Sequence, residues 1–207
     1  MCTFLNSTSL SCAAQVLRVP IYKYREYSKE YPTTTPLHEL AHFGLATAAG
    51  KIVSAPGPIT VTVNAKNSRS DIPLSLAARH GHREMVKMLL DNKADVNAQG
   101  GDYGNALYAA SSGGHEQVVK MLLDNKADIN AQGGRYGNAM HAAAYGGYTE
   151  TLDILLTSGS ISQLQDHCGR TLLWWAAAGD QTSTVEALID QHHIDPERAD
   201  NLGRKPS

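Results

Sequence analysis

One stretch of this chain occurs twice in almost the same form. Residues 86–101, VKMLLDNKADVNAQGG, recur as residues 119–134 with a single change, from Val96 to Ile129. The two copies lie 33 residues apart. So close a copy at so short a spacing indicates a solenoid, in which each repeat buries its apolar face on the next. This feature limits the chain to repeat architectures before any residue is assigned a chemical role.

The same period extends on both sides of the duplicated stretch. Four positions at a spacing of 33 residues begin similar segments: Ile72, Asn105, Asn138 and Thr171. A glycine follows the first three at a constant distance: Gly81, Gly114 and Gly147. An earlier unit begins with Thr-Pro-Leu-His at Thr35 and carries about four extra residues in its second half.

The Thr-Pro-Leu-His segment and the period resemble the ankyrin repeat. The resemblance implies an all-α solenoid of about five helix–turn–helix units with β-turn fingers between them. The ankyrin repeat domain is then expected at residues 35–203. Its units are residues 35–66, 67–99, 100–132, 133–165 and 166–199, preceded by a non-repeat segment, 1–34, and followed by the start of a truncated further repeat, 200–207.

The amino-acid sequence of the fingers is also similar to that of ankyrin arrays appended to fungal signalling ATPases of the NACHT type. GGDYGNAL at residues 100–107 carries this similarity, together with Gly-Arg-Thr at residues 169–171 and a tyrosine-rich lead-in at residues 22–27. It implies that the chain is either a stand-alone binding module or the sensor or regulatory fragment of a larger ATPase. By its residues alone, the lead-in has two interpretations: a basic, tyrosine-rich segment that contacts nucleic acid by stacking, or a linker or cap over the first unit. The second is favoured because Glu26 and Glu30 reduce its positive charge.

The pattern of apolar residues predicts where the helices lie. In the second unit, helices are expected over residues 73–80 and 83–91. The first unit should have a good helix at residues 36–43, a poor one from residue 46, and an irregular loop around residues 54–60, where two prolines end any helix. A softer second helix is expected in the fourth unit at residues 151–156, and the second helix of the fifth unit is expected at residues 183–189.

Two further expectations concern single positions. After each second helix the ankyrin pattern requires a residue with positive φ, and this chain has Lys93, Lys126 and Gly159 there. Either the lysines adopt this backbone, at a cost of about 1–2 kcal/mol each, or the preceding asparagines do. Of Trp174 and Trp175, one should face the core and one the exposed side.

Nothing in the sequence obviously covers Leu188 and Ile189, so the chain is either part of a longer array or has this end covered by a partner or a second copy.

Composition excludes several classes of function. A net charge of −2 argues against general affinity for nucleic acid or membranes, and no apolar run approaches the ~20 residues of a membrane helix. Three cysteines without metal spacing are typical of a reduced intracellular protein, in the cytoplasm or the nucleus. The first residues lack the basic start of a signal peptide.

The nine histidines have structural explanations in the repeat. The resemblance implies that His38 and His141 tie adjacent units together, and His82 and His115 are expected to bond local backbone. None has companion ligands at metal spacing, and the neighbours His167 and Cys168 should point apart on a finger. No nucleophile elbow, paired carboxylates or dinucleotide loop occurs. The chain is therefore expected to be no enzyme and to need no cofactor or metal, and a small-molecule ligand is not expected.

What remains is a surface for a protein partner. In ankyrin folds the concave side, formed by fingers and first helices, is the usual contact face, and its positions here vary while the buried ones repeat. Tyrosine and arginine are also favoured as binding anchors. The predicted partner-binding residues are Arg79, His80, Asp102, Tyr103, Ser112, Arg135, Tyr136, Tyr145, His167 and Arg170.

Overall fold

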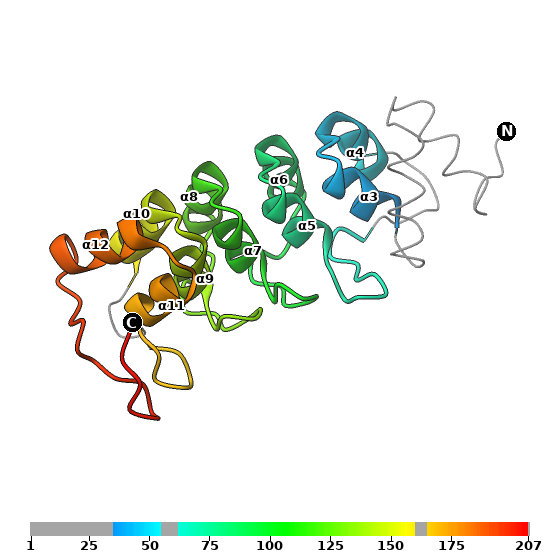
Figure 1. The fold of residues 1–207 in the computed structure, drawn as a ribbon. Coiled ribbons are helices and arrows are strands. Elements are labelled where there is room, and N and C mark those ends of the chain that lie inside the picture. The colour runs from blue at the N-terminus through cyan, green and yellow to red at the C-terminus, as the bar shows by residue number, and fades with distance from the viewer. Residues whose placement is uncertain (1–34, 55–61, 160–164, 207) are drawn as a thin grey trace, which may run out of the picture.

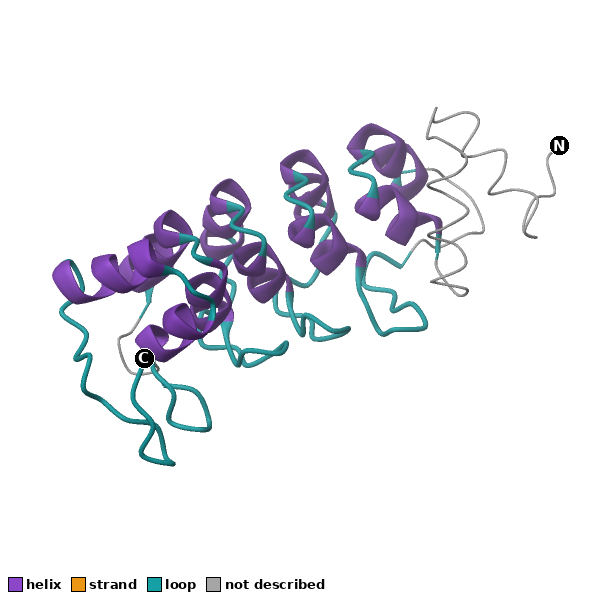
Figure 2. Ribbon diagram, viewed as in Figure 1, coloured by secondary structure: helices purple, strands orange, loops and turns teal. Residues whose placement is uncertain are grey.

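The computed structural model describes residues 35–54, 62–159 and 165–206 of the chain. These residues form ten short helices and, as Figure 2 shows, no strand. In chain order the helices are α3 (Pro36–His42), α4 (Ala46–Val53), α5 (Pro73–Arg79), α6 (Arg83–Asp91), α7 (Ala106–Ser112), α8 (Glu116–Asp124), α9 (Ala139–Gly146), α10 (Thr149–Ser158), α11 (Leu172–Ala178) and α12 (Thr182–Asp190). The predicted all-α class is confirmed. The predicted non-repeat segment, 1–34, lies outside the described residues.

The helices form five pairs that stack side by side (Figure 1). The first helices of the pairs (α3, α5, α7, α9 and α11) form an inner row, in which each helix packs on the next. The second helices (α4, α6, α8, α10 and α12) form an outer row with the same order of neighbours. The loops that lead from one pair to the next extend to the same side of the array. The solenoid predicted from the period is therefore the observed arrangement.

Each inner helix begins at the same point of its repeat because a local signal starts it there. The side chains of Asn105, Asn138 and Thr171 accept hydrogen bonds from the backbone N–H three residues further on, at 2.8, 3.1 and 3.2 Å. The other two inner helices begin with Pro36 and Pro73, whose fixed φ suits a first helical turn.

Two columns of buried residues run through the array. An alanine column on the inner helices is fully buried in four successive repeats: Ala77, Ala110, Ala143 and Ala176. A leucine column on the outer helices is equally buried: Leu89, Leu122, Leu155 and Leu188. The small alanines let the inner helices approach closely, and the leucines fill the space behind them. Helices this short do not persist alone in water, so burial against the neighbouring repeats keeps them folded.

The turn within each pair is crossed by a side chain from the next repeat. Four turn glycines have φ values between 67° and 74°: Gly44, Gly81, Gly114 and Gly147. A Cβ on Gly44 would lie 2.6 Å from Nδ1 of His82, whose Nε2 is 3.0 Å from the carbonyl oxygen of His42. His115 makes the equivalent contact one repeat later, with its Nε2 2.9 Å from the carbonyl oxygen of Arg79. The prediction that these histidines bond local backbone is wrong, because the glycine turn leaves room for them to reach the preceding repeat.

Two more histidine contacts join the first two repeats. Nε2 of His38 lies 3.0 Å from the carbonyl oxygen of Asp71, 33 residues further on, which is the tie predicted for this position. Nε2 of His80 lies 3.1 Å from Nδ1 of His42. Burial, followed by nearby cationic groups that include Arg79, lowers the pKa of His42 and of His80 to about 4. Both imidazoles are therefore neutral near pH 7.

The outer helices differ from the expectation in two repeats. The first outer helix, expected to be poor, is regular over Ala46–Val53, although Ala49 is its one fully buried residue. The fourth, α10, runs from Thr149 to Ser158 and so exceeds the predicted residues 151–156. Because α10 continues to Ser158, the chain leaves it at Gly159 with φ −113° and ψ 164°, and the left-handed turn expected there is wrong. The irregular loop predicted around residues 54–60 lies outside the described residues from residue 55 onward.

The lysines after α6 and α8 have left-handed backbones. Lys93 and Lys126 have φ values of 66° and 69°. The preceding Asn92 and Asn125 have φ values of −94° and −90°. The lysines, and not the preceding asparagines, therefore adopt the positive φ. Each lysine has a backbone conformation that glycine adopts more easily.

The segment after α12 turns back over the end of the array. The N–H of Ile194 donates to the carbonyl of Leu188 at 3.1 Å, and the N–H of Asn201 to that of Cys168 at 3.0 Å. Leu188 is fully buried, so the expectation that nothing covers it is wrong. Ile189 is half-buried beside a shallow hollow of about 340 Å³.

Replacing the left-handed lysines by glycine should stabilise the array. Lys93→Gly and Lys126→Gly should each raise the free energy of unfolding by about 1 kcal/mol, because the Cβ penalty is removed and only part of it is returned as entropy of the unfolded chain. Urea titration followed by circular dichroism measures this. The matched control, Lys87→Gly on the exposed face of α6, should destabilise by about 1 kcal/mol. If all three variants lose stability alike, the strain is absent.

The histidine pair predicts how stability depends on pH. Between pH 6.5 and about 4 the unfolded chain takes up protons at His42 and His80 that the folded chain excludes. Stability should therefore fall as the pH drops through this window, with no further contribution from this pair below it. The melting temperature, followed at pH 7.5, 6, 5 and 4, should fall less in His42→Gln/His80→Gln than in the unchanged chain. Equal losses in both chains would show that other groups cause the effect.

Candidate protein-binding surface

Five hairpin loops, here called the fingers, line one edge of the array. In each finger the N–H of the first residue donates to the carbonyl of the fifth. The fingers are residues 67–71, 100–104, 133–137, 166–170 and 200–204, with N–O distances of 3.0, 2.6, 2.7, 3.0 and 2.9 Å. The fifth follows α12, in the segment that the sequence assigns to a further repeat. A common backbone thus presents different side chains at equivalent places.

A polar side chain at the first position holds three of the fingers. Oδ1 of Asp166 accepts hydrogen bonds from the N–H groups of Cys168 and Arg170, at 2.8 and 2.9 Å. Asn67 and Asp200 accept the equivalent pairs. Burial alone would raise the pKa of Asp166, but the hydrogen bonds from Arg170 and Cys168 outweigh it, and this pKa lies below its usual value. An ionised carboxylate therefore fixes both the finger and the position of Arg170.

Glycine replaces this polar side chain in the second and third fingers, and in the third a tyrosine from α7 takes over its role. The hydroxyl oxygen of Tyr108 accepts hydrogen bonds from the N–H groups of Arg135 and Tyr136, both at 3.0 Å. A Cβ on Gly134 would lie 2.2 Å from the Tyr108 ring, so glycine is required there. Burial raises the pKa of Tyr108 to about 12 despite these bonds, and its hydroxyl stays protonated. Tyr108 thus positions the finger that carries Arg135 and Tyr136.

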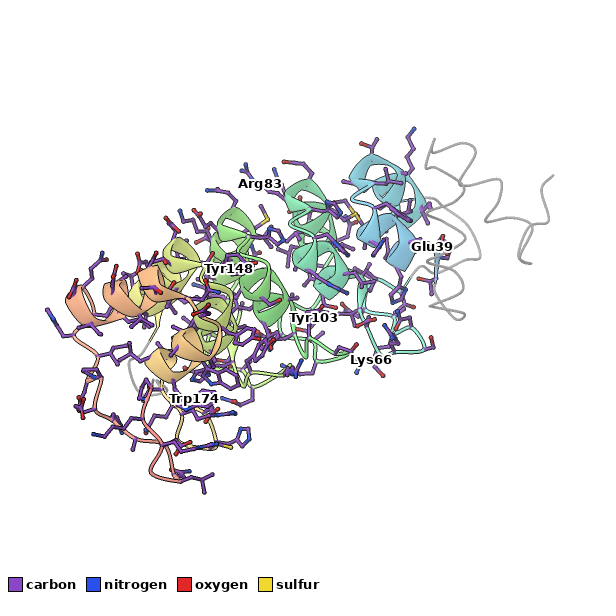
Figure 3. The ribbon with its side chains drawn as sticks, in the orientation of Figure 1. Glu39, Lys66, Arg83, Tyr103, Tyr148 and Trp174 are labelled. Atoms are coloured by element: carbon purple, nitrogen blue, oxygen red, sulfur yellow. The ribbon has the colours of Figure 1, made fainter. Side chains whose placement is uncertain are left out.

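Six aromatic side chains, here called the aromatic row, lie between the fingers and the inner helices. They are Tyr103, Tyr108, Tyr136, Tyr145, Trp174 and Trp175. Tyr136 stacks on Tyr145 with ring centroids 4.4 Å apart and meets Trp175 edge-on at 5.2 Å. Tyr108 and Trp175 are buried, whereas the other four rings are half-buried and reach solvent. In Figure 3, Tyr103 and Trp174 both lie toward the finger-bearing edge.

Three guanidinium groups cover the ends of this row. The distances from Cζ to the ring centroid are 4.6 Å for Arg79 on Tyr103, 4.1 and 4.8 Å for Arg170 on Trp175 and Trp174, and 5.8 Å for Arg204 on Trp174. Nε of Arg170 donates to Oδ2 of Asp166 at 2.7 Å, and Asp200 holds Arg204 in the same way at 2.8 Å. Stacked guanidinium groups of this kind are attracted to the faces of the rings.

The residues predicted from the sequence divide between this row and other places. Five lie in the row or against it: Arg79, Tyr103, Tyr136, Tyr145 and Arg170. Three are exposed on fingers: Asp102, Arg135 and His167. The hydroxyl of Ser112 donates to Ala109 within its own helix at 2.9 Å, and His80 bonds His42, so these polar groups are engaged away from the row.

Tyr108 and Arg204 are not among the residues predicted from the sequence, and for the tryptophans the prediction was only that one of them would be buried. That expectation is confirmed, since Trp175 is 6% exposed and Trp174 is half-buried. The repeat pattern did contain a signal for Tyr108 and Trp174. Both occupy the repeat position of His38 and His141, where an inner-helix side chain reaches toward the next finger.

The described residues contain no group of three or more His, Cys, Asp or Glu placed to hold a metal. None of the helices described is long and apolar enough to cross a membrane. The face formed by fingers and inner helices offers flat rings and guanidinium groups, which suit apolar contact and bidentate hydrogen bonding to another molecule.

The comparisons with known proteins agree with this geometry. The family model described as ankyrin repeats (3 copies) matches residues 37–133 and again residues 133–200. A search of curated proteins finds no match to the chain. The two family matches together span most of the sequence and all five helix pairs. The chain belongs to the ankyrin repeat family.

Proposed function

We propose that this chain is a noncatalytic module that binds a partner protein on the face formed by the fingers and the inner helices. Ankyrin repeats are generally protein–protein interaction modules. The observation that carries the proposal is the aromatic row, four of whose rings reach solvent. The few residues that dominate the binding energy of protein interfaces are enriched in tyrosine, tryptophan and arginine.

The rigidity of this face supports the same proposal. Tyr108 holds the backbone of the third finger, and Asp166 holds that of the fourth. Arg170 is held by Asp166, and its Cζ lies 4.1 Å from the centroid of the Trp175 ring. Side chains that are already ordered lose little conformational entropy when a partner docks, so more of the contact energy appears as affinity.

Variation between the repeats points the same way. Residues 86–101 and 119–134 are nearly identical, yet the finger residues that follow them differ, with Asp102 in one and Arg135 in the next. Packing restricts the buried columns in every repeat, whereas finger residues are free to differ. A face that varies on a constant framework suits recognition of a particular partner.

A second proposal concerns the context of the array. The sequence of residues 100–107 supports the proposal that the chain is a sensor or regulatory fragment of a larger NACHT-type signalling ATPase. The family match covers the ankyrin repeats and gives no information about such an ATPase. Reading the gene upstream in the same frame tests this. A phosphate-loop motif there would support it, and a stop codon directly before Met1 would contradict it.

Removing two half-buried rings of the aromatic row together with Arg135 should strongly weaken binding without unfolding the chain. The triple variant Tyr103→Ala/Arg135→Ala/Tyr136→Ala should recover a partner from cell lysate at least about tenfold less well than the unchanged chain, because several anchors are lost together. The partner is identified by mass spectrometry with the unchanged chain as bait. Far-ultraviolet circular dichroism should show the same helix content in both proteins.

Two further variants keep the comparison specific. Arg83→Ala/Lys87→Ala/Lys120→Ala changes three exposed or outer-row positions on α6 and α8 and should recover the partner normally. Arg79→Gln/Arg135→Gln changes charge without removing a ring and should also weaken recovery. Normal recovery by the finger variants, or loss in the outer-helix variant, would place the binding face elsewhere.

A further inference from the structure

We infer that the partner segment is acidic: an extended peptide whose carboxylates flank at least one apolar or aromatic side chain. This inference rests on the proposed function, since it names the chemistry of the partner at the same face. It is carried by the distribution of charge over the array, by the burial of the acids on the fingers, and by the placement of the arginines on the aromatic row.

Basic side chains gather on the finger side, although the chain as a whole has a formal net charge of −2. The basic residues on the fingers or directly next to them in the sequence are Lys66, Arg69, Arg135, Arg170, Arg204 and Lys205. Arg79, at the end of α5, reaches Tyr103 in the second finger. Figure 3 shows Lys66 on this edge. The outer helices α10 and α12 carry four acidic residues, Glu150, Asp153, Glu186 and Asp190, and no Lys or Arg. An acidic segment is attracted to the first face and repelled by the second.

The acids that accompany the finger arginines are turned inward. The side chains of Asp166 and Asp200 are 0% exposed, whereas those of Arg170 and Arg204 are 19% and 55% exposed. Backbone N–H groups of the same finger surround each carboxylate. Among the five fingers, all of which are described, Asp102 is the one exposed acid. A partner approaching this edge therefore meets guanidinium groups.

Within the described part of the chain, two other arginines have no carboxylate partner that would compete with a ligand. Among the described residues, neither Arg79 nor Arg135 forms an ion pair. Arg79 lies 4.6 Å above Tyr103, and Arg135 is exposed next to Tyr136 in the third finger. A guanidinium group stacked on a ring keeps its N–H edge available for a carboxylate in bidentate geometry. The neighbouring half-buried ring then contacts an apolar side chain.

The length of the face sets the length of the segment. The guanidinium group of Arg79 lies over Tyr103 in the second finger, and Arg170 belongs to the fourth finger, two repeats later. At about 8–10 Å a step these groups are roughly 16–20 Å apart. An extended peptide of about five or six residues spans this distance. Its terminal acids would meet Arg79 and Arg170, and its central side chain would lie on Tyr136 and Tyr145.

Peptide display on the full chain tests the inference. A library of random peptides of about twelve residues, long enough to span the face, is selected against the unchanged protein. Recovered peptides should be enriched in Asp and Glu on both sides of an apolar or aromatic residue. The strongest of them, made with a fluorescent label, is then titrated by anisotropy. A copy with every Asp and Glu changed to Asn and Gln should bind at least about tenfold more weakly.

Protein variants complete the experiment. Arg79→Gln/Arg135→Gln should weaken the acidic peptide at least about tenfold, and Arg83→Gln/Lys87→Gln on α6 should not. Peptides that need Tyr103 and Tyr136 but carry no excess of acid would overturn this inference and leave the proposed function standing. Peptides indifferent to every finger variant would overturn both. Failure to select any peptide, or tighter binding of a labelled single-stranded RNA of about twelve nucleotides with the same arginine dependence, would overturn the acidic-peptide assignment.

Discussion

Every part of this molecule depends on the burial of short helices against their neighbours. None of the ten described helices is long enough to persist alone in water. What keeps each one folded is a column of alanines on the inner row and a column of leucines on the outer row, fully buried in repeat after repeat. Histidines such as His38 and His115 add polar ties between adjacent repeats. The array is therefore a linear structure in which a repeat is stable because the adjacent repeats are present.

The stacking also builds the surface, since side chains that join two repeats hold the fingers in place. Tyr108 is a core residue of one repeat and the hydrogen-bond acceptor for the finger of the next. Trp175 is buried beside Asp166 and supports Arg170 from below. Loss of such a residue would disturb the fold and the face together. The half-buried rings and the arginines beside them are the residues proposed to contact a partner, and they lie outside the alanine and leucine columns that hold the stack.

Much of the fold could be predicted from the sequence, because the period places equivalent residues in equivalent environments. The helix pairs followed from the spacing of apolar residues, and α6 has its predicted limits. Contacts between repeats were harder to predict. The reach of His82 to the preceding repeat depends on the space left by Gly44, and the bond from Tyr108 depends on Gly134. Such contacts need both partners in three dimensions, and local propensity carries no information about them. The same holds for Arg204, whose contact with the Trp174 ring joins the fifth finger to α11.

Deletion of one complete repeat tests the central claim most directly. Removing residues 106–138 joins Asn105 to Ala139, which preserves the cap, the helix start and the register of the columns because 33 residues are lost. The shortened chain should keep the same helix content per residue by circular dichroism and melt cooperatively at a lower temperature. A deletion of about 25 residues from the same start breaks the period and should abolish cooperative melting. If the in-register deletion unfolds the chain as completely as the out-of-register one, stacking of equivalent repeats does not hold this protein together.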